Sequence, residues 1–486
     1  MIPLTLAEVR DIVGGHLLDA ESDIAVTGNV EFDSRKIERG GLFLAFPGEH
    51  ADGHEFVASA RERGAIAAIV TRPVDGPRIE VDDGRAALAA LASAVARRLA
   101  DTTIIGITGS SGKTSTKDLL AHVLEQLGPT VAPPGSFNNE LGHPYTVLRA
   151  DAGTRFLVLE TSARGIGHIR YLTEIAPPRI GVVLNVGSAH LGEFGSRDAI
   201  ALAKGELVEA LPAAADGGVA VLNADDPLVL AMRDRTAARI VTFGESGTAD
   251  VRAEDIELDE LGRASFRLLT ASGSAAVHLQ VVGAHQVSNA LAVAAVALEC
   301  GMPLEDVAAA LSSAQPRSRW RMELTERADG VLVLNDAYNA NPESMRAALK
   351  SLAALTRSRA GRSFAVLGPM AELGPDGPAE HDGLGRLAVR LDITRVIAVG
   401  DDARPIQHGA ALEGSWNGEA SWVPDVDAAV RMLRAELRPG DVVLIKASRA
   451  ASLERIALAI ADDATSTTSA DDADGDTDEP TGGRTA

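Results

Sequence analysis

Some residue types are scarce in this chain of 486 residues, which has one cysteine and only 3% aromatic side chains. The single thiol, Cys300, excludes an internal disulfide and indicates a reducing compartment. No apolar run approaches the roughly 18–20 residues that a membrane-spanning helix needs. The first residues, MIPLTLAEVR, lack the pattern of a secretory signal, and Thr5 and Glu8 are spaced as a helix capping box. We therefore expect a cytoplasmic protein without membrane insertion, with Cys300 buried as a small apolar residue.

Positive charge is also scarce, because 46 Lys and Arg stand against 68 Asp and Glu, for a formal net charge of −22. Residues 462–486 hold eight acids and one arginine, so this tail carries about −7 of the total. The tail has no apolar periodicity, and we expect it to be disordered. The acidic body argues against nucleic acid as a partner.

Lysine is rarer than arginine, with only Lys36, Lys113, Lys117, Lys204, Lys350 and Lys446 in the whole chain. A chain that uses arginine for routine surface charge makes each lysine a candidate for chemistry that a guanidinium cannot perform. Lys117 and Lys350 also fit ordinary positions on a helix surface.

The length predicts several domains, all of the α/β class. We place a small N-terminal α/β domain at 1–100, a central parallel-sheet domain of the P-loop type at 101–314, and a C-terminal Rossmann-like domain at 315–461. Buried-strand runs at 103–107, 156–159, 180–184, 219–222 and 240–243 define the central sheet, and residues 250–282 alternate as antiparallel strands do. Further runs at 331–334, 364–367, 396–399 and 442–445 define the C-terminal sheet.

Residues 103–117, TIIGITGSSGKTSTK, are the strongest functional motif. A strand, a loop of small residues and a helix start can hold phosphate, because loop amides and the helix dipole face the anion and a lysine reaches its end. A glycine-rich strand–turn–helix is the structural alternative. Gly106 lies one residue too far from Gly112, with Ile107 in the expected glycine position, so the loop is a variant. The candidate nucleotide-binding residues are Thr108, Gly109, Ser110, Ser111, Gly112, Lys113, Thr114 and Ser115.

Polar residues follow several strand runs, at the sheet edge where α/β proteins bind ligands. Glu160 comes directly after 156–159 and could hold Mg²⁺, and Thr161 and Ser162 come next. His190 lies on a Gly/Ser loop and Lys204 follows it. Either residue alone is more often structural. Because both lie at the edge of a phosphate site, a functional role and a structural role are about equally supported.

Other polar groups leave two readings open. Ser34, Arg35 and the loop 48–54 could bind an anionic or sugar-like ligand, or form a solvated turn. His285 and Asn289 could contact a base or ribose, or cap a helix. The C-terminal strand ends carry a polar edge made of Asp336, Asn339, Asn341, Lys446, Ser448 and Arg449. Such an edge suggests a site completed by domain closure.

Five strings of residues resemble the Mur ligase family: SFNNELG at 136–142, NVGSAH at 185–190, AKGE at 203–206, NADDP at 223–227 and DAYNANP at 336–342. Together with the variant loop, the likeness spans roughly residues 25–460. The resemblance implies an ATP-dependent, amide-bond-forming enzyme of peptidoglycan precursor synthesis. The strings fit the member that adds D-alanyl-D-alanine to UDP-N-acetylmuramoyl-tripeptide through an acyl phosphate, with ADP and phosphate as products.

The resemblance also implies residue roles. Lys113 and the loop amides would hold ATP phosphates, Thr114 and Glu160 one Mg²⁺, and His190 with a carbamylated Lys204 a second Mg²⁺. Asn289, Arg321 and Asp336 would contact ATP. Ser34, Arg35, Asn138, Asn139, Thr161 and Ser162 would face the UDP-sugar-peptide. Pro369 departs from the acid of many relatives, and Arg317 and Arg319 crowd Trp320 beside Arg321.

Three other functions fit the sequence less well. A sibling ligase that adds a diamino acid would have an Asp-Asn-Pro-Arg string, which is absent from the chain. Folylpolyglutamate synthetase shares the architecture but matches these strings less closely. A nucleotide switch has no need for the set Glu160, His190 and Lys204. We expect a monomeric, cytoplasmic enzyme of cell-wall synthesis that acts on small molecules.

Overall fold

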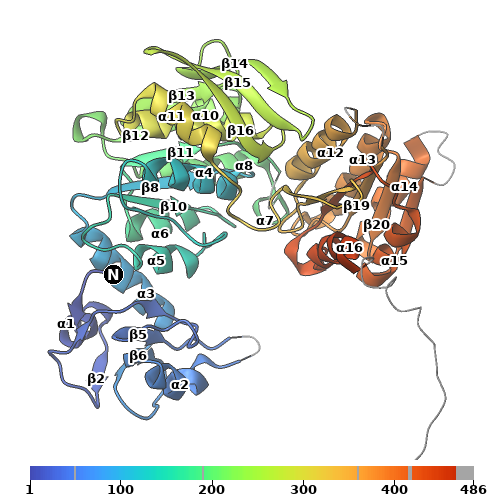
Figure 1. Cartoon of the computed structure of the whole chain (residues 1–486). Helices are drawn as coiled ribbons and strands as arrows, with labels where there is room; N and C mark the ends of the chain where they lie inside the picture. Colours follow the sequence, from blue (N-terminus) through green and yellow to red (C-terminus); the bar gives the residue numbers. More distant parts are fainter. Residues whose placement is uncertain (49–50, 189–190, 358, 360, 414–418, 467–486) are drawn as a thin grey trace, which may run out of the picture. The chain divides into compact units, whose positions relative to one another are not determined.

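The computed structural model describes residues 1–48, 51–188, 191–357, 359, 361–413 and 419–466. Two compact units make up the fold (Figure 1). The first holds Met1–Arg319, Asn341–Ala347 and Glu372–Gly377, and the second holds Trp320–Ala340, Ala348–Ala371 and the described residues from Pro378 onward.

The N-terminal part of the first unit is built on a five-stranded sheet, drawn in blue in Figure 1. Its strand order is β2 (His16–Leu18), β7 (Arg78–Glu80), β6 (Ala65–Val70), β5 (Gly41–Leu44) and β4 (Val30–Glu31), and β1 (Leu4–Thr5) pairs with β3 (Ala25–Val26) outside it. The helices are α1 (Leu6–Val13), α2 (Val57–Glu62) and α3 (Gly84–Arg98). The predicted capping box is confirmed, because Thr5 and Glu8 bond reciprocally at the start of α1.

A nine-stranded sheet forms the centre of the first unit. Its order is β16 (Gly273–Val282), β15 (Arg263–Thr270), β14 (Val251–Leu258), β13 (Arg239–Gly244), β12 (Val219–Asn223), β11 (Ile180–Val183), β8 (Thr103–Thr108), β10 (Phe156–Glu160) and β9 (Thr130–Val131). Strands β9 to β14 pair in parallel, whereas β15 pairs with both of its neighbours in the antiparallel sense. All five predicted strand runs and the antiparallel segment are confirmed.

The core of this sheet follows from the apolar spacing of its helices. In α4 (Lys113–Glu125), Leu119, Leu120, Val123 and Leu124 are buried in one cluster with α10 (Gln286–Glu299) and the strands β8, β10 and β11. The remaining helices are α5 (Gly142–Val147), α6 (His168–Ile175), α7 (Leu191–Phe194), α8 (Arg197–Glu209), α9 (Pro227–Leu230) and α11 (Leu304–Ser313). A second cluster joins α3 to Leu157 and Leu159 of β10. A domain boundary at residue 100 therefore stays a prediction.

The second unit contains a six-stranded sheet with the order β17 (Glu323–Glu326), β18 (Leu332–Asn335), β22 (Val442–Lys446), β19 (Ser363–Leu367), β20 (Arg395–Val399) and β21 (Ala420–Val423). Only β17 is antiparallel to its neighbour. The helices that lie wholly or mostly in this unit are α12 (Pro342–Arg357), α13 (Gly377–Arg390), α14 (Arg404–Glu413), α15 (Val426–Glu436) and α16 (Glu454–Ser466), and the first residues of α12 and α13 belong to the first unit. The predicted α/β class and the four C-terminal strand runs are confirmed.

Two side chains differ from expectation. Lys117 is buried rather than on the helix surface, with its ammonium donating to the Pro133 carbonyl at 2.9 Å and paired with Asp118. Cys300 is only partly buried, because it is the C-cap of α10 rather than an interior helix residue. Within the ranges described above, no helix has the length and apolar character that a membrane crossing requires.

Candidate functional site

The phosphate loop connects β8 to α4 and is shaped by a glycine. Gly112 has φ +81° and is the N-cap of α4, which begins at Lys113. A Cβ on Gly112 would lie 2.5 Å from Oδ1 of Asn289. The position therefore needs glycine both for its left-handed backbone and for the close approach of Asn289. The predicted strand, loop and helix order is the one observed, and Asn289 of α10 reaches the loop.

Asn185, which follows β11, holds the phosphate loop in place. Its side-chain Oδ1 accepts from Ser111 N at 2.9 Å, its Nδ2 donates to Ser111 O at 3.2 Å, and its carbonyl accepts from Ser110 N at 3.1 Å. Gly187 N donates to Ser110 Oγ at 2.8 Å. Lys113 Nζ donates to the Gly109 carbonyl at 2.7 Å, within its own loop. Asn185 is the first residue of the NVGSAH string that resembles the Mur ligase family, but nothing in the sequence indicated that it holds the loop in place.

Buried oxygen atoms gather directly beside the loop. Thr114 Oγ1 donates to Glu160 Oε2 at 3.1 Å and shares a hydrogen bond of 2.8 Å with Ser136 Oγ. The other carboxylate oxygen, Oε1 of Glu160, accepts from Asn138 Nδ2 at 2.7 Å. The backbone explains the arrangement, because β10 pairs in parallel with β8 and both strands end at this edge. Hydroxyl and carboxylate oxygens are ligands that Mg²⁺ accepts, usually beside water and substrate phosphates.

Lys204 lies in α8 and is buried. Burial lowers the pKa of its amine well below the usual range, and the nearby charge of Lys113 lowers it further. Lys113 of the phosphate loop is therefore close enough to affect Lys204 electrostatically, and the predicted role of Lys204 at the phosphate site stays a prediction. His190, its predicted partner, lies outside the described residues. No cluster of three or more His, Cys, Asp or Glu that could hold a metal occurs in the part of the chain that the structure describes.

An aromatic cluster extends from this site into the N-terminal part of the unit. The ring of Phe32 has its centroid 5.0 Å from that of Tyr145 and 6.5 Å from that of Phe137, while Phe46 lies 6.4 Å away. Tyr145 donates to Glu31 Oε2 at 2.8 Å. Sequence reasoning missed this cluster. The available signal was that Phe32 and Phe46 lie on either side of the candidate ligand residue Ser34, in a chain with only 3% aromatic residues. Residues 136–138 link the cluster to Thr114 and Glu160.

The residues predicted to face the UDP-sugar-peptide have different surroundings. Asn138 and Ser162 stand together beside Glu160, with Ser162 Oγ donating to Asn138 Oδ1 at 3.0 Å. Asn139 instead accepts from Gly142 N at 2.9 Å at the start of α5. Thr161 bonds through its amide and hydroxyl to the Ile107 carbonyl, at 2.8 and 3.1 Å. The hydrogen bonds of Asn139 and Thr161 therefore stabilise the local backbone.

Ser34 and Arg35 follow β4. Ser34 is buried, whereas Arg35 is exposed and pairs with Asp33 at 2.8 Å, which holds the pKa of that carboxyl down at about 2. Of the predicted loop 48–54, residues 49 and 50 lie outside the described residues. His54 at its end is buried and contacts Asp52 at 2.6 Å. A cavity of about 350 Å³ lies nearby, lined by Phe46, Pro47, Thr71, Asp82, Asp83, Gly84, Arg85 and Leu141.

In the second unit, Lys446 at the end of β22 binds two predicted site residues. Its ammonium lies 2.6 Å from Asp336 Oδ2 and donates to the Asn339 carbonyl at 2.8 Å. Ser448 Oγ accepts from Ala371 N at 2.9 Å. Sequence reasoning placed Lys446 and Asp336 in separate roles, for substrate and for ATP, but the structure pairs them.

Arg321 and Arg449 each lie over an aromatic ring in this unit. The guanidinium of Arg321 is 4.3 Å from the Tyr338 ring, and that of Arg449 is 4.5 Å from the Trp320 ring. Trp320 and Met322 on either side of Arg321 have φ of +59° and +52°. Left-handed backbone at bulky residues costs energy and concentrates at functional sites. Of the three arginines near Trp320, Arg321 is the one that lies between these two residues, and its predicted contact with ATP stays a prediction.

Asn341 belongs to the first unit, apart from Asn339. Its side chain donates to the Ser110 carbonyl at 3.2 Å. Glu343, two residues further on, accepts from the amide and the hydroxyl of Ser188, both at 2.9 Å. Sequence reasoning missed Glu343, because a glutamate in the first turn of a helix is ordinary.

A phosphate loop on a parallel sheet, with a buried carboxylate and an amine of lowered pKa beside it, defines a nucleotide-dependent group-transfer enzyme. Comparison with family models identifies the class. Residues 27–96 match the Mur ligase family catalytic domain, 107–297 the Mur ligase middle domain, and 320–449 the Mur ligase glutamate ligase domain. The chain belongs to the Mur ligase family, and the predicted resemblance is confirmed.

Individual relatives sharpen this result. The chain is 55% identical to UDP-N-acetylmuramoyl-tripeptide--D-alanyl-D-alanine ligase of Mycobacterium tuberculosis, over 95% of this chain and 99% of the relative. It is 35% identical to the ligase of the same name from Escherichia coli, over 96% and 100%. Among solved structures, MurF from Acinetobacter baumannii matches with a TM-score of 0.82 and 34% identity, over 93% and 98%. MurF ligase from Thermotoga maritima in complex with ADP matches with a TM-score of 0.77 and 29% identity, over 91% and 99%.

Proposed function

We propose that this chain is an ATP-dependent ligase that joins D-alanyl-D-alanine to UDP-N-acetylmuramoyl-tripeptide, giving the pentapeptide precursor of peptidoglycan. The observation that carries this proposal is the 55% identity, over nearly the whole of both chains, to a relative named for this reaction. The phosphate loop of 108–115 supports the use of ATP, as does the similar structure that contains ADP.

The reaction has two steps. A terminal carboxylate oxygen of the tripeptide attacks the γ-phosphorus of ATP, the bond to the β,γ-bridging oxygen breaks, and ADP leaves an acyl phosphate. The free amine of D-alanyl-D-alanine then attacks the acyl carbon and loses a proton, and inorganic phosphate leaves. The first step brings an anion toward an anion, so Lys113 and the amides at the start of α4 reduce the repulsion.

Mg²⁺ fits the oxygen atoms beside the loop. Thr114 and Glu160 would hold it, because a hydroxyl and a buried carboxylate lie within 3.1 Å of each other, and Thr114 directly follows the lysine proposed to contact phosphate. When bound, Mg²⁺ would neutralise phosphate charge and polarise the γ-phosphoryl group. Asn138, which bonds to the other carboxylate oxygen, would keep Glu160 oriented.

Lys204 is the proposed site of carbamylation. Burial and Lys113 disfavour its charged form, and only a neutral amine can react with CO₂. The carbamate is an anion, so it would be stabilised by the neighbouring charge of Lys113, and its oxygens could hold a second Mg²⁺ with His190. An arginine could not perform this reaction, which accounts for a lysine at this position.

The remaining predicted contacts complete the proposal. The first unit would bind the UDP-sugar near Ser34 and Arg35, with the exposed ring of Phe32 available for stacking on uracil. Asn138 and Ser162 would face the sugar–peptide, while Asn289, Arg321 and Asp336 would contact ATP. Asn339, Asn341, Lys446, Ser448 and Arg449 would line the D-alanyl-D-alanine edge. We also propose that the enzyme is monomeric and cytoplasmic.

The test is the substrate dependence of phosphate release. Purified protein with ATP and Mg²⁺ should release phosphate only when both UDP-N-acetylmuramoyl-tripeptide and D-alanyl-D-alanine are present, and mass spectrometry should show the pentapeptide product. Turnover with a dipeptide precursor and one free diamino acid would instead indicate the sibling ligase. Turnover of ATP with neither substrate would contradict a ligase altogether.

A further inference from the structure

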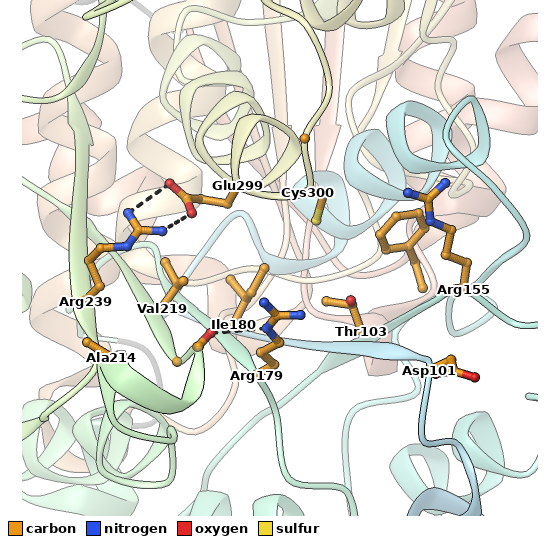
Figure 2. A pocket seen from close by; sticks show the side chains of 14 residues that line it. Asp101, Thr103, Arg155, Arg179, Ile180, Ala214, Val219, Arg239, Glu299 and Cys300 are labelled. Atoms are coloured by element: carbon orange, nitrogen blue, oxygen red, sulfur yellow. Dashed lines mark hydrogen bonds and ion pairs between the residues drawn. The ribbon is translucent and has the colours of Figure 1, made fainter.

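A second polar cavity, of about 450 Å³, lies in the first unit at the edge where strands of the central sheet begin (Figure 2). Thr103, Phe156, Ile180, Val219 and Arg239 are the first residues of five neighbouring strands and all line it. The phosphate loop follows the opposite end of β8, roughly 17 Å away at about 3.3 Å per strand residue. The cavity is therefore separate from the nucleotide site.

Arginines dominate the charge of this cavity. Its lining has three guanidiniums, those of Arg155, Arg179 and Arg239, against the carboxylates of Asp101 and Glu299. Figure 2 shows Arg239 and Glu299 joined by two interactions, so their charges largely cancel. The remaining two arginines have no carboxylate within ion-pair distance in the described ranges. With three arginines and two carboxylates the lining has a net charge of +1, in a chain with a net charge of −22.

The structural uses of these two arginines leave most of their donors uncommitted. Arg155 donates through one nitrogen to the Leu127 carbonyl, and its guanidinium lies 5.1 Å from the Phe156 ring centroid. Arg179 donates through Nε to the Gly217 carbonyl at 3.2 Å. A guanidinium has five N–H groups in a planar fork. These hydrogen bonds to backbone carbonyls therefore use one donor of each arginine. They give no explanation for the cavity between the two side chains.

The same cavity also contains the side chain of Cys300. Cys300 lines the cavity at the end of α10. Burial raises its pKa to about 12, whereas the charges of Arg179 and Arg155 act in the opposite direction. Cys300, Arg155 and Arg179 therefore line one and the same cavity. Because Cys300 is the only cysteine of the chain, it gives a unique chemical reporter for this cavity.

We propose that this cavity binds a small, multiply charged oxyanion between Arg155 and Arg179, with the Thr103 hydroxyl as a further donor. Guanidinium groups bind phosphate and carboxylate through paired, charge-assisted hydrogen bonds. The cavity volume is sufficient for a sugar phosphate or a tricarboxylate, and phosphate esters and polycarboxylates share the chemistry that the two arginines recognise. The site does not depend on the ligase reaction proposed above.

The experiment measures binding of two probes, pyrophosphate and citrate, to the full chain by calorimetry. The protein carries Lys113→Ala, which weakens binding at the phosphate loop. In this background we expect pyrophosphate to bind, and the pair Arg155→Gln/Arg179→Gln to weaken binding at least about tenfold, because the two substitutions remove the charge-assisted hydrogen bonds to the anion. Glutamine keeps an amide donor for the backbone carbonyls. Arg233→Gln, which removes an exposed arginine outside the cavity, is the matched control.

Alkylation of Cys300 by iodoacetamide locates the bound anion without any change to the arginines. With pyrophosphate at about ten times its dissociation constant, the rate should fall about tenfold, because only the free protein reacts. Equal protection by citrate would identify carboxylates as ligands too, and protection by pyrophosphate alone would identify phosphate. An absence of binding by both probes, binding unchanged by the arginine pair, or no protection of Cys300 would overturn the proposal.

Discussion

The ammonium of Lys446 lies 2.6 Å from a carboxylate oxygen of Asp336, and both side chains are buried. The two residues are 110 positions apart and close the ends of the neighbouring strands β22 and β18. Burial lowers the pKa of the Lys446 amine, and the charge of Asp336 offsets part of that effect. A second carboxylate oxygen of Asp336 accepts from Met322 N at 3.1 Å. The pair therefore ties three segments of the second unit together.

Lys446→Met should destabilise the second unit by about 3–5 kcal/mol, because it leaves the Asp336 carboxylate buried without a counterion. The double variant Lys446→Met/Asp336→Leu should recover much of that loss, since it buries no charge. Urea unfolding followed by tryptophan fluorescence measures this, because all three tryptophans fall between residues 320 and 422. Lys350→Met, at an exposed helix position, is the control. Equal losses in the single and double variants would show that the pair contributes packing rather than charge.

The same pair shows how far the sequence could be read. The strand runs, the parallel character of the sheets and the phosphate loop were predictable, because buried β-branched runs and a strand–glycine–helix pattern are local signals. Asp336 and Lys446 were recognised as polar residues at strand ends. Their pairing was not predictable, because it depends on β22 lying next to β18 in the sheet, a choice made by tertiary packing.

Other misses have the same cause. Asn185 and the aromatic ring of Phe137 gain their roles only when separate segments meet. Lys117 fitted a helix surface by spacing, yet the Pro133 carbonyl covers it from another segment.

Thr114→Val should reduce phosphate release by at least about a hundredfold and raise the Mg²⁺ concentration needed for half-maximal rate, because the hydroxyl that bonds to Glu160 is lost. Thr114→Ser should retain most activity. Thr116→Val is the matched control, since the buried Thr116 hydroxyl has no hydrogen-bond partner within the described ranges. That control should keep full activity and stability. A Thr114→Val enzyme with normal Mg²⁺ dependence would remove Thr114 from the proposed metal site.

Lys204→Ala should lose most activity and recover some with added short carboxylates, which can occupy the space of the proposed carbamate. Independently of activity, ¹³C NMR of the wild-type protein in labelled bicarbonate should show a carbamate resonance that Lys204→Arg lacks. Lys350→Ala should leave both the rate and the resonance unchanged. A wild-type rate for Lys204→Ala, or a resonance that persists in Lys204→Arg, would refute carbamylation at this residue.

Gly112→Ala tests whether the phosphate loop needs glycine for the close approach of Asn289 or only for its left-handed backbone conformation. The alanine would pay about 1–2 kcal/mol for its left-handed conformation, and its Cβ would also meet Asn289 Oδ1 at 2.5 Å. Gly135→Ala isolates the first effect, because Gly135 has φ +60° with open space around its Cβ position. We expect Gly112→Ala to weaken ATP binding far more than Gly135→Ala does, as measured by calorimetry. Adding Asn289→Ala to Gly112→Ala should restore stability but not ATP affinity, if Asn289 also contacts the nucleotide. Full recovery of affinity in that double variant would leave Asn289 with a purely steric role.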